Sequence, residues 1–212
     1  MAIIQDGILG AFTGRVGPVT GFKRNGINIM RTARSGKDKK ITPGRAAQRE
    51  KMKVCNAFTK PFCGTGFFSR TFPADGTSAT GYSRATSAIM NLAVSGTYPE
   101  IVISYPDVLI SRGQLPGAES ASATLGEDEN ITFTWENNSG KGTAKGKDKV
   151  ILVAYFPQMR QVLFTIGAAT RADKLATLET KSMKGAAAET WIGFLSNDEK
   201  IASDSVYCGS LE

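Results

Sequence analysis

The sequence contains no histidine, and none of its three cysteines, Cys55, Cys63 and Cys208, belongs to a Cys-x-x-Cys pair. A zinc site would therefore lack its usual ligands. The missing histidine also removes the common general base near neutral pH and the Ser-His and Cys-His nucleophile pairs. We expect a protein that is not an enzyme and that has no catalytic residue, no metal and no cofactor.

Long apolar runs are also missing. The longest one, Val150 to Phe156, has the length of a strand and falls short of the about 18 residues that indicate a membrane-spanning helix. The N-terminal residues show neither the basic region nor the apolar stretch of a Sec signal. The sequence therefore predicts cytoplasmic synthesis without a membrane span. Release in a virion or in an extracellular assembly is the alternative that these absences leave open.

Positive charge is concentrated in the first sixty residues. They hold thirteen basic and three acidic residues, a net charge of +10, whereas residues 61–212 hold thirteen basic and sixteen acidic residues, a net charge of −3. Opposite charges on two parts of one chain favour head-to-tail contacts between copies, that is, a homo-oligomer. A basic segment also binds nucleic acid without sequence preference, because lysine and arginine release counterions from phosphates.

The pair Asn25-Gly26 is the strongest turn signal, since a two-residue type I′ loop needs positive φ at both positions. It predicts a hairpin in which Phe22 faces Ile29, with Ile27 on the same apolar face. The glycine-rich stretch before this hairpin is either a bulged strand or an extended arm. As an arm, it would pair with the sheet edge of a neighbour.

Two helices are predicted next. Thr42-Pro43 places a capping hydroxyl before a proline suited to the first helical turn. The apolar stripe of this helix is Ala47, Val54, Cys55 and Phe58, and a basic ridge of Arg45, Arg49 and Lys53 lies on another face. A Phe-rich loop and a second amphipathic helix over residues 82–93 follow.

From residue 100 onward the pattern changes to short β-rich runs separated by turn residues. Strands are predicted at 101–105, 108–111, 121–125, 130–135, 149–156, 162–167, 177–182, 189–196 and 205–209. The expected fold is α+β and mainly β: an N-terminal hairpin and helices packed with an immunoglobulin- or fibronectin III-like β-sandwich, whose core holds Trp135 and Trp191. The expected domains are a basic hairpin and two-helix module at 1–99 and the sandwich at 100–212.

Several short motifs occur in the order of one known family. They are Gly14-Arg15-Val16-Gly17-Pro18-Val19, Met30-Arg31, Thr42-Pro43 with Ala47-Gln48-Arg49, Gly96-Thr97-Tyr98-Pro99, Ser111-Arg112-Gly113 with Leu115-Pro116, and Trp191-Ile192-Gly193-Phe194 with Ser205-Val206-Tyr207. With them the chain resembles an uncharacterised Bacteroidota family of proteins of similar length, catalogued as a domain of unknown function. The resemblance implies this architecture and a bacterial or phage origin, and it implies no activity and no catalytic residue. The chain departs from the family pattern at Phe22-Lys23-Arg24, where more aromatic character is usual.

Two other motifs fail closer inspection. The run Gly140 to Lys147 lacks the spacing of a Walker phosphate loop and is predicted to be a loop between strands. The acidic residues at 127–129 and 198–204 do not match a calcium-binding loop and are predicted to be solvent-exposed turns.

The leading functional hypothesis is a non-enzymatic, self-assembling structural protein such as a phage virion or filament subunit. The alternative is a nucleic-acid-binding accessory protein, although no helix-turn-helix, RNP or zinc-finger spacing is present. A third is a ligand-binding or adhesion β-sandwich. The candidate contacts with an anionic partner or another subunit are Lys23, Arg24, Arg31, Arg34, Arg45, Arg49 and Lys53.

Overall fold

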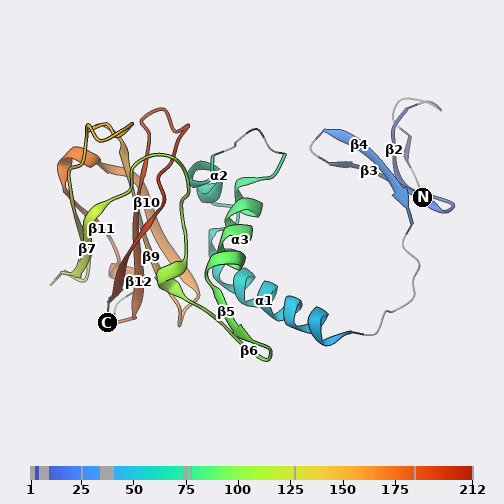
Figure 1. Cartoon of the computed structure of the whole chain (residues 1–212), viewed down its shortest axis with the longest axis horizontal. Coiled ribbons are helices and arrows are strands. Elements are labelled where there is room, and N and C mark those ends of the chain that lie inside the picture. Colours follow the sequence, from blue (N-terminus) through green and yellow to red (C-terminus); the bar gives the residue numbers. More distant parts are fainter. Residues whose placement is uncertain are drawn as a thin grey trace. The chain divides into compact units, whose positions relative to one another are not determined.

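The computed structural model describes residues 3–4, 10–24, 26–33, 41–73, 76, 78–126, 128–183 and 185–211. The chain divides into two compact units, residues 1–42 and residues 43–212, here named the N-terminal unit and the main unit (Figure 1). The sequence instead predicted a boundary after residue 99. The division falls before the first helix because the helices share a hydrophobic core with the strands that follow them.

The described part of the N-terminal unit is an antiparallel sheet with the strand order β1-β2-β3-β4, here named the N-terminal sheet. Its strands are β1 (Ile3–Ile4), β2 (Phe12–Val16), β3 (Val19–Arg24) and β4 (Ile27–Thr32). The hairpin of β3 and β4 has the predicted register, with Phe22 opposite Ile29. Gly26 has a φ of +82°, which favours glycine, whereas Asn25 lies outside the described residues.

The main unit begins with helix α1 (Pro43–Thr59), at the predicted proline, and continues with η1 (Lys60–Phe62), α2 (Phe67–Thr71) and α3 (Gly81–Leu92). Both predicted helices are therefore confirmed. Thr80 caps α3, since its hydroxyl accepts the Ser83 backbone N–H at 3.2 Å. The predicted Phe-rich loop is wrong in part, because α2 forms there and buries Phe67 and Phe68.

The rest of the main unit is made of strands joined by short turns. A hairpin of β5 (Val94–Thr97) and β6 (Glu100–Ile103) is followed by η2 (Tyr105–Asp107). One sheet has the order β10-β9-β12-β13 and another has the order β11-β8-β7. Their bounds are β7 Glu119–Leu125, β8 Ile131–Glu136, β9 Lys149–Phe156, β10 Gln161–Thr170, β11 Leu175–Leu178, β12 Ala188–Leu195 and β13 Val206–Leu211, with η3 Arg171–Asp173 and η4 Lys181–Met183 between them.

Two of the predicted strands need correction. Residues 108–111 are not a strand, although Val108 and Ile110 are buried. Two of their backbone groups bond to Ser205 instead of to a strand. The Ser205 hydroxyl accepts the Ile110 N–H at 3.0 Å, and the Ser205 N–H donates to the Ser111 carbonyl at 3.1 Å. The strand predicted at 177–182 lies earlier, at 175–178, because residues 181–183 form the turn η4.

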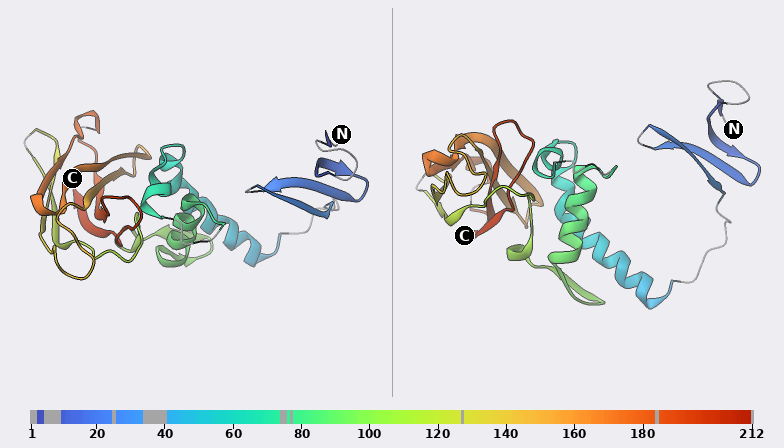
Figure 2. Two further views of the ribbon diagram at one scale, coloured as in Figure 1. Left: turned by 90° about the horizontal axis from the view of Figure 1, so that it is seen from above. Right: turned by 45° about the horizontal axis from the view of Figure 1, so that its top comes forward.

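Strand β9 is buried on both faces, which explains why it is the longest apolar run of the sequence. Its residues Ile151, Val153 and Tyr155 belong to the core shared with α1, α2 and α3. These helices lie on one side of the sheet β10-β9-β12-β13 (Figure 2). The alternate residues of β9, including Leu152 and Phe156, pack against the three-stranded sheet. The period of two along a strand thus divides one segment between two cores.

The two tryptophans lie in different cores, whereas the sequence predicted a single one. Trp135 packs between the two sheets, where its ring centroid lies 6.2 Å from that of Phe194. Trp191 points to the helical side, where its ring centroid lies 5.9 Å from that of Phe58 on α1. Phe58 also meets Tyr155 of β9 at 4.8 Å between ring centroids. These ring contacts join α1 to β9 and β12.

A fully buried arginine ties the two larger sheets together. Arg171 Nε donates to Asp148 at 3.1 Å, and both side chains are at most 1 % exposed. The guanidinium also donates to Asn138 and, at 3.0 Å, to the carbonyl of Pro116. Its carbon lies 3.7 Å from the ring centroid of Phe194. Nearly all polar atoms of this group are therefore satisfied without water.

We predict that Asp148→Asn lowers the free energy of unfolding by about 3–5 kcal/mol, because it leaves the buried guanidinium without its counter-charge. Chemical denaturation measures this change. Glu50→Gln is the matched control, since Glu50 pairs with Lys53 at 3.0 Å on the surface of α1, outside the Arg171 network, and exposed pairs contribute at most about 1 kcal/mol. Equal losses in the two variants would contradict the role given to the buried pair.

A second ion pair fastens the turn after β12 to the helical layer. Glu199 accepts two hydrogen bonds from Arg70 of α2, at 2.9 and 2.7 Å, and one from Lys149 of β9 at 2.6 Å. The hydrogen bonds from Arg70, and then those from Lys149, lower the pKa of Glu199 from 4.5 to about 2. The contribution of this carboxylate to stability is therefore present above pH 4.5 and is lost as the pH falls toward 2.

We predict that Glu199→Gln removes part of the acid sensitivity of the fold. Thermal unfolding measured between pH 7 and pH 2 should show a smaller loss of stability for this variant between about pH 4.5 and pH 2. Glu100→Gln is the control, because Glu100 is exposed and has no ion-pair partner among the described residues. A Glu199→Gln profile parallel to that of the unmodified chain would refute the assignment.

Candidate interaction surfaces

The predicted contact residues fall into two groups on different units. Lys23 and Arg24 lie on β3 and Arg31 lies on β4 of the N-terminal sheet. Arg45, Arg49 and Lys53 lie on α1 of the main unit. Arg34 lies outside the described residues. The described contact residues therefore belong to two compact units, one group to each unit.

One face of the N-terminal sheet combines arginines with apolar side chains. The register places Arg15 and Arg31 on either side of Thr20, and the same face carries Phe22. The guanidinium carbon of Arg31 lies 5.0 Å from the centroid of the Phe22 ring. The sequence predicted this face as apolar and missed Arg15, which the two-residue turn at residues 17–18 brings beside β3. Lys23 lies on the opposite face.

The described residues of the N-terminal sheet form no hydrophobic core. Among its described residues only Gly21 is buried, and the Phe12 ring covers it so closely that a Cβ there would come within 2.8 Å of that ring. Some large apolar side chains are partly buried, namely Phe12, Val19, Phe22 and Ile29, and others are exposed on both faces. Their exposed fractions are Ile3 64 %, Val16 52 %, Ile27 64 % and Met30 69 %. Isolated sheets of this size need a covered apolar face for stability.

The sheet also has an open edge at β4, which pairs only with β3 among the described strands. The Ala33 N–H donates to the Pro18 carbonyl at 2.7 Å. Because bonded and non-bonded pairs alternate in an antiparallel ladder, Thr32, Met30 and Asn28 direct their backbone groups away from β3. These groups form a template on which a further strand can be added.

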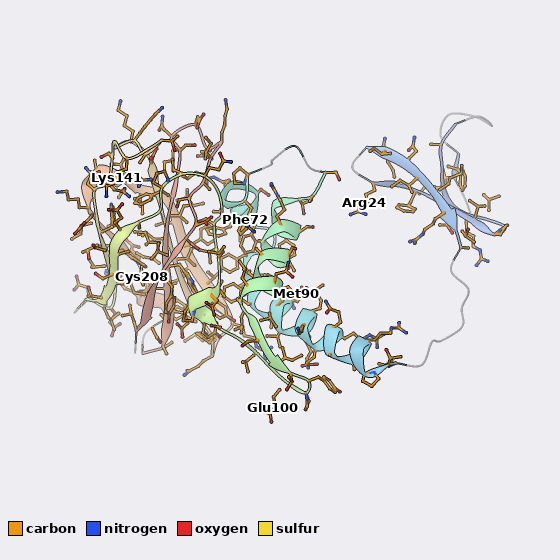
Figure 3. The ribbon with its side chains drawn as sticks, in the orientation of Figure 1. Arg24, Phe72, Met90, Glu100, Lys141 and Cys208 are labelled. Atoms are coloured by element: carbon orange, nitrogen blue, oxygen red, sulfur yellow. The ribbon has the colours of Figure 1, made fainter. Side chains whose placement is uncertain are left out.

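The basic ridge on α1 is exposed, and its charge is partly compensated within the helix. Lys53 Nζ lies 3.0 Å from the Glu50 carboxylate, and the Lys53 side chain is 75 % exposed. Arg45 and Arg49 are also exposed. Cys55 is the first buried residue of α1, so the first turns of this helix project from the core of the main unit (Figure 3). This surface is available to a partner, but it carries less uncompensated charge than the sequence suggested.

The thiols of the main unit differ in exposure. Cys55 is buried, and burial raises the pKa of its thiol to about 11. Burial also raises the pKa of Cys208 to about 12, whereas Cys63 is exposed.

Within the described residues no group of three or more His, Cys, Asp or Glu side chains is placed to hold a metal ion. No described helix is long and apolar enough to cross a membrane.

A family model for a domain of unknown function, DUF6266, matches residues 11–209. The chain belongs to this family. The DUF6266 match begins just before β2 and ends within β13, so it includes β2, β3 and β4 of the N-terminal sheet together with nearly all of the main unit. Both units are therefore parts of one family architecture. A search of the curated proteins finds no match.

Proposed function

We propose that this DUF6266 protein is a non-enzymatic structural protein that assembles from many copies, with the N-terminal sheet as the connector. The observation that carries the proposal is the sheet itself, which exposes apolar side chains on both faces and encloses none among its described residues. The absence of histidine supports a role without acid-base catalysis.

The N-terminal sheet exposes apolar side chains on both faces, so one covering surface is not enough, and we propose that a second copy provides the other. Burying a side chain such as Ile27 or Met30 is worth about 1.5–3 kcal/mol. Ile27 and Met30 lie on opposite faces, because they are an odd number of residues apart on one strand. One covering surface leaves one of them in water. A second surface is needed, and another copy of the chain supplies it.

Charge favours a head-to-tail arrangement over a symmetric one. The N-terminal unit has eight basic and two acidic residues, whereas residues 61–212 have sixteen acidic and thirteen basic residues. Two such sheets face to face would bring their arginines together, which is unfavourable. A sheet placed on the acidic part of the next copy avoids this repulsion. Such heterologous contacts propagate into filaments or shells, so we propose a filament or phage virion subunit.

We also propose that the building block of the assembly is an immunoglobulin- or fibronectin III-like sandwich. Its seven strands, β7 to β13, divide into a three-stranded and a four-stranded antiparallel sheet. An apolar core from both sheets lies between them. This division and this core support the assignment.

We predict that Ile27→Lys combined with Met30→Lys abolishes assembly, because a charge on each face prevents burial of the sheet. Size-exclusion chromatography with light scattering should give multiples of 22.6 kDa that rise with concentration for the unmodified chain and a single 22.6 kDa species for the double variant. Negative-stain microscopy should show filaments or shells only for the former.

The matched control is Val102→Lys combined with Leu175→Lys, which changes two exposed apolar residues of the main unit, at 59 % and 53 % exposure. This control should assemble normally. A 22.6 kDa monomer for the unmodified chain at high concentration would overturn the proposal. Equal assembly of the two double variants would show that copies make contact through a surface other than the N-terminal sheet.

We predict that Asn28→Pro weakens assembly if copies join by strand addition at β4. Asn28 directs its N–H away from β3, so proline there removes an edge donor and spares the ladder. Asn28→Ala keeps the N–H and should assemble like the unmodified chain. Light scattering at matched concentrations compares the two. Normal assembly of Asn28→Pro would assign the contact to the faces of the sheet alone.

A further inference from the structure

A cleft of about 870 Å³ lies within the main unit, on the side of α3 that faces the connections around the β-strands. One wall is a face of α3 that includes Arg84 and Leu92, and the other is formed by residues 112–114 and 200–204. Phe72, labelled in Figure 3 at the end of α2, also lines the cleft. This volume is in the range of sites that hold small molecules.

Three backbone N–H groups hold the wall that carries Arg112, and their acceptors lie on α2 and on residues 202–204. The Arg112 N–H donates to the Thr71 carbonyl at 3.1 Å, and the Leu115 N–H donates to the Ala202 carbonyl at 3.0 Å. Between them, the Gly113 N–H donates to the Asp204 carboxylate at 3.0 Å. A Cβ on Gly113 would come within 2.2 Å of the Ala202 carbonyl oxygen, so the two segments touch as closely as glycine permits.

The charged groups of the cleft are not equally engaged. Arg84 donates to the carbonyls of Phe72 and Pro73, which gives it a structural role. The Arg112 guanidinium is exposed and has no hydrogen-bond or carboxylate partner among the described residues.

Lys200 is also only weakly engaged. Its side chain is 80 % exposed, and the nearest carboxylate is that of Asp198, at 3.9 Å from Nζ. Asp204, a carboxylate of the lining, already accepts the Gly113 N–H. The cleft lining therefore carries three cations, Arg84, Arg112 and Lys200, against one carboxylate, Asp204. Arg112 and Lys200 are the two exposed cations among them.

Apolar side chains lie in the same cleft. Leu92 is 53 % exposed and Ile201 is 42 % exposed, although both are large and apolar. A bare inorganic anion would leave them in water. A ligand that carries an apolar group beside its charge would cover them.

We infer that this cleft binds a small organic anion. A carboxylate or phosphate group accepts hydrogen bonds from Arg112 and Lys200, and the attached apolar group lies against Leu92 and Ile201. The planar guanidinium of arginine suits both head groups, because it donates two parallel hydrogen bonds to either. The site is independent of the N-terminal sheet, so it stands whether or not the protein assembles.

Calorimetric titration of the full chain tests the inference with phenyl phosphate, benzoate and inorganic phosphate at constant ionic strength. We expect saturable binding of phenyl phosphate or benzoate, with the tighter of the two identifying the head group, and weaker binding of inorganic phosphate. Arg112→Gln should lower the affinity for the organic anion by about tenfold or more, which is the usual effect of losing a hydrogen bond to a charged group. Arg112→Lys keeps the charge without the fork and should lose less.

Two further variants separate the site from general effects. Arg160→Gln removes an exposed arginine from the β9–β10 turn and should leave binding unchanged. Leu92→Gln should lower the affinity for the organic anions and leave the affinity for inorganic phosphate unchanged. Absence of saturable binding of both organic anions would overturn the inference. Equal losses in Arg112→Gln and Arg160→Gln would also overturn it, because they would show attraction by net charge alone.

Discussion

The main unit depends on one strand, β9, whose two faces belong to two hydrophobic cores. From Val150 to Phe156 each residue is at most 4 % exposed, so this strand has no side chain in water along that run. It joins the helical layer to the three-stranded sheet and pairs with β10 and β12 at its two edges. Displacing it would expose both cores at once. The helices and sheets therefore form one cooperative unit, and the division at residue 42 follows from that coupling.

The two units meet the need for burial in opposite ways. The main unit encloses its apolar side chains and even an ion pair, Arg171 with Asp148. Three strands of the N-terminal sheet, β2, β3 and β4, have ordinary lengths, but none of the described apolar side chains of the sheet is fully buried. Its backbone order rests on tight turns and cross-strand pairs, which specify register at little cost in buried area. This arrangement supports the proposal that the N-terminal sheet contacts a surface outside its own unit.

Local signals in the sequence were enough for the elements whose cause is local. The register of the β3–β4 hairpin follows from a two-residue turn, and the start of α1 follows from Thr42-Pro43. Segments stabilised by distant partners were missed. Residues 108–111 were predicted as a strand because they form a short apolar run, yet the backbone groups of Ile110 and Ser111 bond to Ser205, far along the chain. The cleft could not be predicted from the sequence for the same reason, since α3, residues 112–114 and residues 200–204 meet only in the folded chain.

Arg112 and Gly113 are neighbours whose substitution is limited by different forces. Gly113 is required by the close approach of two backbone segments, so its replacement harms folding whatever the protein does. Arg112 contributes a backbone N–H to that junction, but its exposed side chain has no hydrogen-bond partner among the described residues. In evolutionary terms, the close backbone contact constrains the glycine through folding, whereas the proposed ligand would constrain the arginine through binding. Covariation of Arg112 with Lys200 among relatives is therefore the pattern that the proposed site would leave, separate from selection for stability.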